Sequence, residues 1–312
     1  MTMTTAFLFP GQGAQAIGMG QDLCDNSPAA ASLFEQAEAI SGLPLRTLCF
    51  EGPQDELNRT DIAQPAIFTA SAAMLAVMGE RLGDAMPTPD VMAGLSLGEY
   101  TALYAAGAMD FATAVTLVTR RGAAMQEAAL SVPSGMVSVM GLDEAQAQGL
   151  CDAAAQGDVL TCANFNAPGQ IVLSGAAEAC KRVTAMAEEH GASGAVELQV
   201  AGAFHSPIMA PAAEKLAAAI EDATFADPTT PVIANVDAAI YTSASEIKDK
   251  LLAQLTGSVR WAQSMRVLLD GGLETPYEVG PGRVLTGLMR RNERKCRVTT
   301  VNSLEAIDKL KE

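Results

Sequence analysis

The order of predicted strands and helices constrains the fold of this 312-residue chain more than any other sequence feature. In both outer parts of the chain, short apolar strands alternate with helices, which is typical of a mainly parallel sheet covered by helices. Residues 136–200 read instead as strand, helix, two strands, helix and strand, the split unit of ferredoxin-like folds. We therefore predict an α/β protein in which a small domain, residues 132–200, is inserted into a larger domain of residues 1–131 and 201–312.

The individual elements are predicted from apolar runs, capping residues and turn residues. Asp110, for example, is a suitable N-cap for the long helix that follows it. The larger domain is expected to contain strands at residues 5–10, 90–95, 232–235, 275–279 and 297–301, and helices at 27–40, 61–78, 97–106, 111–129, 211–222, 244–255 and 261–269. The inserted domain is expected to contain strands at 136–142, 159–163, 170–174 and 194–200, and helices at 143–155 and 176–190.

The charge and the cysteines of the chain argue against several classes of function. A net charge of −16 disfavours nucleic-acid binding and a polybasic membrane anchor, so an anionic ligand would need a local basic pocket. The six cysteines are scattered, without C-x-x-C or zinc spacing, which indicates free thiols in a reducing cytoplasm and no metal site. No signal peptide is evident, and Gln64 and Pro65 interrupt the uncharged run 62–79, as in a buried helix rather than a membrane span.

The stretch VMAGLSLGEY, residues 91–100, places Ser96 at G-x-S-x-G spacing between a predicted strand and a predicted helix. Glycines tolerate the crowded backbone of such a junction, and the serine hydroxyl then projects at the helix N-terminus, where developing negative charge is favoured. Ser96 is therefore a candidate nucleophile. The alternative is a small residue in a tight turn.

A serine needs a base to become nucleophilic at neutral pH, and the chain has two histidines. His190 ends a predicted helix, where a helix-capping role suffices to explain it. His205, where the larger domain resumes, is thus the candidate base, unless it is simply a turn residue beside Pro207. For the oxyanion, the N–H of Leu97 is one candidate donor, and the glycine-rich turn GQGAQ (11–15) offers a glutamine side chain, Gln12 or Gln15.

Arg121 is the most informative single charge. On a helical wheel at about 100° per residue, it falls within the apolar arc of helix 111–129, whereas Arg120 falls on the polar side. Because a buried guanidinium is costly unless it is paired, Arg121 should either meet an internal carboxylate or bind a carboxylate of the substrate.

Six motifs follow one another along the chain: GQGAQ (11–15), GLSLGEYTAL (94–103), Arg121-Gly122 with MQEA (125–128), NFNAPGQ (164–170), GAFHS (202–206) and YEVGPGRVLTGL (277–288). Together they closely resemble the malonyl-CoA:acyl-carrier-protein transacylases of bacterial fatty-acid synthesis and the related acyltransferase domains of polyketide synthases. The resemblance covers essentially the whole chain. It implies an α/β-hydrolase-like larger domain with a ferredoxin-like (βαββαβ) insertion.

The resemblance also implies a role for each matching residue. Ser96 would carry the acyl ester, His205 would act as general base and then acid, and Gln12 with the Leu97 N–H would form the oxyanion hole. Arg121 would bind the malonyl carboxylate, and Asn166 would contact the substrate. Phe204, in Ala203-Phe204-His205, would restrict the pocket to a malonyl-sized group. The backbone carbonyl of Arg260 would orient the histidine, so that no aspartate completes a triad. Leu95 stands where the family commonly has histidine, a difference that concerns the shape of the pocket.

The implied reaction is a ping-pong transfer of malonyl from malonyl-CoA to acyl carrier protein by a monomer that needs no cofactor. The basic run from Arg290 to Arg297 and the pair Lys181 and Arg182 would contact the anionic partners, although a solvated loop explains the run equally well. The alternatives are a polyketide synthase acyltransferase acting in trans, a serine hydrolase or thioesterase with water as acceptor, and a noncatalytic scaffold that binds carrier proteins.

Overall fold

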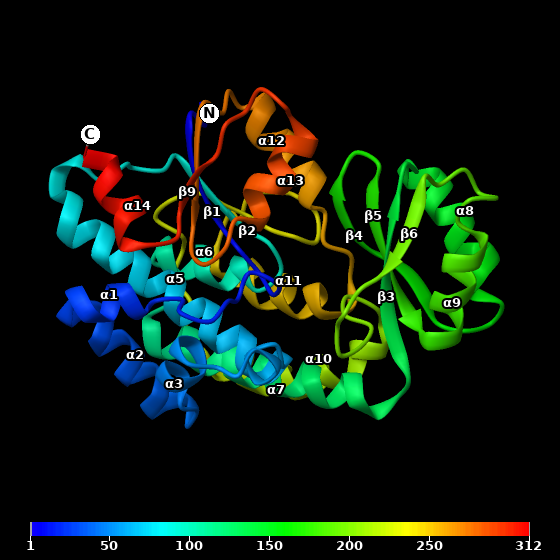
Figure 1. Cartoon of the computed structure of the whole chain (residues 1–312), viewed down its shortest axis with the longest axis horizontal. Helices are drawn as coiled ribbons and strands as arrows, with labels where there is room; N and C mark the ends of the chain where they lie inside the picture. The colour runs from blue at the N-terminus through cyan, green and yellow to red at the C-terminus, as the bar shows by residue number, and fades with distance from the viewer. Residues whose placement is uncertain (1, 312) are drawn as a thin grey trace.

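The computed structural model describes residues 2–311 and contains two β-sheets that lie side by side (Figure 1). The larger sheet is parallel throughout, with the strand order β7-β2-β1-β8-β9. Its strands are β1 (Thr5–Phe9), β2 (Val91–Gly94), β7 (Val232–Ile233), β8 (Thr275–Val279) and β9 (Thr299–Val301). The carboxyl ends of these strands lie at one edge of the sheet, where ligands of α/β proteins usually bind.

The smaller sheet is antiparallel, with the order β4-β5-β3-β6. Its strands are β3 (Ser134–Met140), β4 (Leu160–Ala167), β5 (Gln170–Ala176) and β6 (Gly194–Glu197), and its helices are α8 (Glu144–Ala155) and α9 (Ala177–Met186). These helices and strands enclose a separate hydrophobic core that includes Val137, Leu150 and Leu173. The predicted α/β class, with one parallel sheet and a separate antiparallel one, is confirmed.

Twelve further helices accompany the parallel sheet in the described part of the chain. They are α1 (Gln21–Asn26), α2 (Pro28–Ser41), α3 (Leu45–Phe50), α4 (Gln54–Leu57), α5 (Thr60–Leu82), α6 (Gly98–Ala105), α7 (Phe111–Ser131), α10 (Ala210–Asp222), α11 (Ala244–Thr256), α12 (Trp261–Asp270), α13 (Val284–Asn292) and α14 (Leu304–Asp308). As predicted, Asp110 caps α7, because its carboxylate accepts a hydrogen bond of 2.7 Å from the Thr113 N–H.

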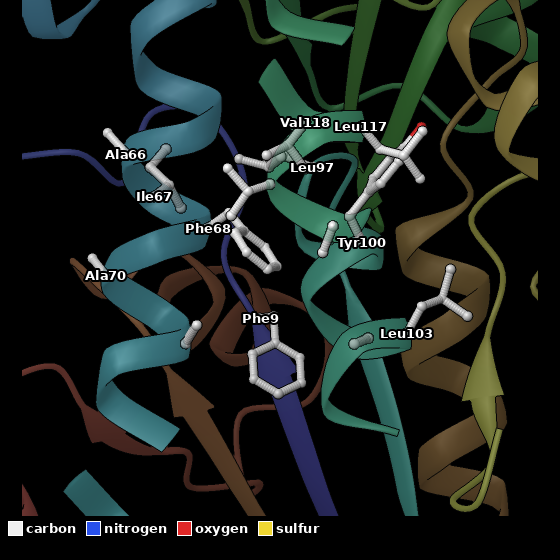
Figure 2. Close-up of a cluster of buried hydrophobic side chains, with 14 of the residues drawn as sticks. Phe9, Ala66, Ile67, Phe68, Ala70, Leu97, Tyr100, Leu103, Leu117 and Val118 are labelled. Atoms are coloured by element: carbon white, nitrogen blue, oxygen red, sulfur yellow. The ribbon is translucent and has the colours of Figure 1, made fainter. Parts of the chain in front are cut away.

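Strand β1 divides the core of the larger sheet between its two faces, because successive side chains of a strand point in opposite directions. Phe7 and Phe9 pack into the cluster formed with α5, α6 and α7, whereas Ala6 and Leu8 pack into the cluster formed with α12 and α13. Figure 2 shows Phe9 on β1 between helix α5, which carries Phe68, and helix α6, which carries Leu103. Each fully buried aromatic or leucine side chain contributes roughly 1.5–3 kcal/mol relative to an exposed one.

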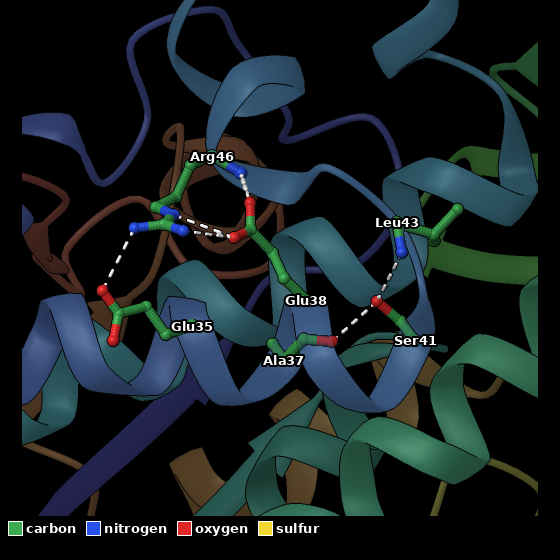
Figure 3. A network of polar contacts seen from close by, with 6 residues as sticks. All are labelled: Glu35, Ala37, Glu38, Ser41, Leu43 and Arg46. Carbon is green, nitrogen blue, oxygen red and sulfur yellow. Dashed lines mark hydrogen bonds and ion pairs between the residues drawn. The ribbon is translucent and has the colours of Figure 1, made fainter.

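Helix α5 is the central helix of this core. The helical stretch Thr60–Ala85 is long and apolar enough to span a membrane by length and composition, yet 83% of its most apolar window is buried inside the protein. The prediction of a buried helix is therefore confirmed. Around this core, polar contacts fix the helix ends, as where Arg46 of α3 pairs with Glu38 of α2 at 2.6 Å (Figure 3). Because Arg46 is half-exposed, that pair adds at most about 1 kcal/mol.

The structure corrects several predicted boundaries. The helix expected at 176–190 ends at Met186. His190 lies in the turns that follow, and its backbone N–H donates a hydrogen bond to the Met186 carbonyl. A solvated loop was one explanation for the basic run from Arg290 to Arg297, but Arg290 and Arg291 belong to helix α13. Helices α1, α3, α4, α13 and α14 were not predicted. All of these except α13 have only four to six residues, and elements that short depend on tertiary packing rather than on a periodic pattern.

Candidate active site

Ser96 lies on the predicted strand–turn–helix junction, between β2 and α6. Its φ angle of 53° places it in the left-handed region, an arrangement that costs a non-glycine residue about 1–3 kcal/mol. The flanking glycines are required: a Cβ on Gly94 would lie 1.9 Å from the Gly98 carbonyl, and one on Gly98 would lie 2.1 Å from the Phe9 carbonyl. The Ser96 N–H donates to Asn235 Oδ1 at 2.6 Å, which helps to hold the strained turn.

His205 lies next to Ser96, with 2.8 Å between the histidine Nε2 and the serine Oγ. The other ring nitrogen, Nδ1, is 2.7 Å from the backbone carbonyl of Gln254. Because a carbonyl only accepts hydrogen bonds, this contact keeps the proton of the neutral ring on Nδ1 and leaves Nε2 free to accept the serine proton. The pair is therefore arranged as nucleophile and general base.

The electrostatic surroundings keep His205 in the form that a base requires. The side chain is buried, and burial together with the nearby Arg121 lowers its pKa from 6.5 to about 4. A group with a pKa near 4 is neutral at pH 7, so Nε2 is available as an acceptor without prior loss of a proton.

The prediction for Arg260 is wrong. Its carbonyl accepts from the backbone N–H and the hydroxyl of Ser264, at 3.0 and 3.1 Å, and the carbonyl that orients His205 belongs to Gln254. Gln254 is in the last turn of α11, where backbone carbonyls lack an intrahelical partner and can accept from elsewhere. The Arg260 guanidinium lies over the Phe165 ring and contacts Glu144 at 3.4 Å, so it does not line the active-site cavity described below.

Arg121 is 1% exposed, whereas its neighbour Arg120 is exposed, as the helical wheel predicts. Its Nη1 donates to Gln64 Oε1 at 2.6 Å, and its Nη2 donates to Gln254 Oε1 at 2.9 Å and to Ser96 Oγ at 3.0 Å. Its Nε has no partner, and no carboxylate within residues 2–311 forms an ion pair with it. A buried cation held by neutral groups beside the nucleophile is arranged to receive an anionic substrate group.

The two candidate oxyanion donors, Leu97 and Gln12, do not form hydrogen bonds to Ser96 or His205 in this structure. The Leu97 N–H precedes α6 and donates no hydrogen bond to any residue in the range 2–311. Gln12 lines the same cavity as Ser96 and at present donates to Thr60 Oγ1 at 3.2 Å. The alternative, Gln15, instead donates to Asn58 and accepts from the Gly13 N–H, and it is not among the residues that line the cavity. The geometry thus favours Gln12.

The cavity over Ser96 has a volume of about 260 Å³ and lies between the two sheets. Phe204 and Leu95 contribute to its wall, as do Asn166 and Gln170 of the small sheet, whose amide oxygens are buried without a hydrogen-bond partner. The structure therefore brings together Ser96, His205, Arg121, Gln12, Leu97, Phe204 and Asn166. No three His, Cys, Asp or Glu side chains in the described part of the chain are grouped as metal ligands.

Several residues of the site were missed by sequence reasoning. Gln254 contacts the base through its carbonyl and Arg121 through its side chain, and Asn235 holds the turn at Ser96. One signal was available for Gln64, because it interrupts the apolar run of a helix that is otherwise buried. Nothing comparable marks Gln254, which follows a charged stretch on a helix of mixed composition.

Comparison with known proteins places this geometry among its relatives. The acyl transferase domain family matches residues 6–309. The malonyl CoA-acyl carrier protein transacylase of Bacillus subtilis is 43% identical over 304 residues, covering 97% of this chain and 95% of that protein. The Escherichia coli K12 protein of the same name is 44% identical over 286 residues, or 92% of each chain.

Solved structures show the same likeness. The malonyl CoA-acyl carrier protein transacylase of Coxiella burnetii superposes with a TM-score of 0.93 at 39% identity, covering 98% of this chain and 96% of that one. A malonyl-transacylase in complex with a type II PKS acyl-carrier protein superposes with a TM-score of 0.92 at 39% identity, covering 97% of each chain.

Proposed function

This chain belongs to the acyl transferase domain family, among the malonyl-CoA:acyl-carrier-protein transacylases, and we propose that it transfers malonyl from malonyl-CoA to the phosphopantetheine thiol of an acyl carrier protein for fatty-acid synthesis. One observation carries the choice of substrate. The guanidinium of Arg121 is buried 3.0 Å from the nucleophilic oxygen and has no carboxylate partner within residues 2–311. Malonyl is a small acyl group that brings such a carboxylate to this position.

The two half-reactions use the same residues. His205 Nε2 takes the proton of Ser96 as Oγ attacks the thioester carbonyl, and the oxyanion is held by the Leu97 N–H and Gln12, at roughly 3 kcal/mol per donor. Collapse breaks the C–S bond, and the coenzyme A thiolate takes the proton from His205. The carrier thiol then gives its proton to Nε2, and its sulfur attacks the malonyl ester and displaces Ser96, which recovers the proton. No cofactor enters either step.

The cavity wall fits the arm that delivers the acyl group. Asn166 and Gln170 line the cavity with buried amide oxygens that have no partner, and a phosphopantetheine arm has amide N–H groups to donate to them. Phe204 closes the wall beside His205, which leaves little room for a substituent on the malonyl α-carbon. These contacts explain how the thioester would be held against Ser96.

A panel of acyl-CoAs tests the proposed function directly. We expect malonyl-CoA to be transferred to the carrier with a kcat/KM at least about 100-fold above that of acetyl-CoA, because acetyl would leave the Arg121 cation unpaired. Transfer and free malonate are measured together, with carriers of fatty-acid and polyketide synthesis as acceptors. Rapid release of malonate to water without carrier would identify a hydrolase, and no acyl-enzyme from any acyl-CoA would identify a noncatalytic scaffold. Faster transfer to the polyketide carrier would assign the chain to that pathway.

The carrier and coenzyme A are anionic, and one surface of this acidic chain suits them. Arg290, Arg291, Arg294 and Arg297 line a cavity of about 840 Å³ beside Pro168. None of the four forms an ion pair within residues 2–311, whereas Lys181 and Arg182, the second predicted patch, are paired with Glu178 and Asp158. We place the docking surface at the four arginines, because their charges are not already neutralised.

Reversing two of these charges should weaken docking without disturbing the chemistry. For the variant Arg290→Glu/Arg291→Glu, we expect the KM for the carrier to rise about 10-fold or more at low salt, with kcat changed less than twofold, since surface charges chiefly affect encounter. Steady-state transfer at several salt concentrations measures this. The matched control, Lys181→Glu/Arg182→Glu, should leave the carrier KM unchanged. Equal KM values for both variants and the wild type would place docking elsewhere.

We also propose that the chain has two domains, with residues 132–200 inserted in a domain of residues 1–131 and 201–312. The small sheet has its own core, and its order β4-β5-β3-β6 with two helices supports a ferredoxin-like fold. The parallel sheet with a nucleophile after β2 supports an α/β-hydrolase-like larger domain. The six free cysteines fit a cytoplasmic location.

A further inference from the structure

Glu99 is a carboxylate buried directly behind the nucleophile, and the mechanism above does not use it. It lies in the first turn of α6 and is 1% exposed. One of its oxygens accepts from the Tyr241 hydroxyl, and the other accepts from Gln254 Nε2 at 2.6 Å and from the Asn235 N–H at 3.1 Å. Neither Glu99 nor any of these three donors lines the cavity over Ser96, and two of the donors, Gln254 and Asn235, also bond directly to Ser96.

The side-chain amide of Gln254 links Glu99 to both the nucleophile and the arginine. Its Nε2 donates to Glu99 and, at 3.0 Å, to the Ser96 backbone carbonyl. Its Oε1 accepts from Arg121 Nη2 at 2.9 Å. Gln254 is 0% exposed, so water cannot replace any of these partners without a rearrangement of the core.

This amide has one favourable orientation, and the acceptors around it decide which one. Turning it over would place its NH2 group against the guanidinium of Arg121, donor against donor. Its oxygen would then face the Glu99 carboxylate and the Ser96 carbonyl, acceptor against acceptor. Because buried polar groups without a partner are costly, the turned state is strongly disfavoured while Glu99 is present.

We propose that Glu99 is a positioning residue for malonyl selection: it fixes the orientation of the Gln254 amide, whose oxygen then holds Arg121 beside Ser96. This inference rests on the proposed function, since it concerns how the malonyl carboxylate finds its partner. Glu99 would not touch the substrate. It would act through Gln254, whose side-chain oxygen fixes the position of Arg121 Nη2.

The role of Glu99 does not require its negative charge. Burial raises its pKa from 4.5 to about 7, opposed by hydrogen bonds from Tyr241 and Gln254 and by the charge of Arg121; Tyr100 is the other titratable group nearby. When Glu99 is protonated, the proton can lie on the oxygen that faces Tyr241, whose own oxygen accepts it. The oxygen that faces Gln254 remains an acceptor in both states. A glutamine at position 99 can reproduce the protonated arrangement.

A comparison of Glu99→Met with Glu99→Gln tests the proposal. We expect Glu99→Met to lower the malonyl-CoA to acetyl-CoA ratio of kcat/KM about 10-fold or more, because a hydrogen bond to a charged group is weakened. Most of this loss should appear in the KM for malonyl-CoA, while acetyl transfer stays within about threefold of the wild type. Glu99→Gln should keep the wild-type ratio. Melting temperatures of both variants show whether the fold is retained.

A double-mutant cycle separates positioning from a general structural effect and keeps the test valid if Glu99→Met folds poorly. Gln254→Met removes the amide alone and should lower the same ratio by a similar factor. Glu99→Met/Gln254→Met should be no worse than the poorer single variant, because both act through one contact. Independent losses that multiply, or an unchanged ratio in Glu99→Met or Gln254→Met, would overturn the proposal while leaving malonyl transfer by the wild type intact. A wild type without malonyl preference would overturn both proposals.

Discussion

Ser96→Ala is expected to abolish acyl transfer, with kcat lowered by about five orders of magnitude or more, because no other group can carry the ester. The wild-type enzyme mixed with malonyl-CoA should gain one malonyl group in intact mass, and the variant should gain none. Removing the oxygen also relieves no strain at the turn, since alanine at φ 53° is as unfavourable as serine. The variant should therefore melt close to the wild-type temperature.

Two variants complete this test. Ser32→Ala, at an exposed position of α2, should retain the full mass gain and activity. His205→Ala should acylate far more slowly than the wild type because the serine loses its base, and its mass gain should appear only on long incubation. A malonyl adduct on Ser96→Ala at the wild-type rate would show that the nucleophile is misassigned.

Arg121→Ala should have the second largest effect and should act on selectivity. Losing a buried cation that pairs with the substrate carboxylate costs about 3–5 kcal/mol, so kcat/KM for malonyl-CoA should fall roughly 100- to 5,000-fold. Acetyl-CoA has no carboxylate to lose, and its kcat/KM should change much less. The preference for malonyl is therefore expected to disappear, as competition between the two acyl-CoAs in one reaction would show.

The adjacent residue supplies a matched control for that substitution. Arg120 lies on the exposed side of the same helix and pairs with no carboxylate within residues 2–311, so Arg120→Ala should leave both rates unchanged. Arg121 also donates to Ser96 Oγ, and losing this contact would lower kcat/KM for both acyl-CoAs by the same factor. A malonyl preference that survives in Arg121→Ala would remove this arginine from substrate binding.

Local patterns in the sequence predict most of this fold. The N-cap at Asp110 and the alternation of strands and helices predict elements whose bounds differ from those observed by at most four residues, as at the ends of α5, β4 and α9. Helices such as α3 and α4 could not be predicted, because four to six residues carry too few periodic positions. They form because their apolar residues, Leu45 and Leu57 among them, are buried in the core around α5.

The site divides in the same way between what a sequence displays and what only folding creates. Ser96 is marked by its glycines, and Arg121 by a charge within an apolar arc. The carbonyl that orients His205 has no sequence signal, because every residue has a carbonyl and only its place at the end of α11 frees this one. The orienting carbonyl therefore belongs to Gln254, six positions before the Arg260 that the resemblance implies.

The two sheets contribute differently to the cavity, and this has a consequence for how such an enzyme can diverge. Ser96, Arg121 and His205 come from elements around the parallel sheet, whereas Met136, Asn166, Gln170 and Val172 of the wall come from the antiparallel one. The reacting groups and this part of the wall are thus encoded in separate stretches of the gene. Changes confined to β3, β4 and β5 can retune which thioester arm is accepted while the reacting groups keep their places, so new specificities are reachable without loss of the chemistry.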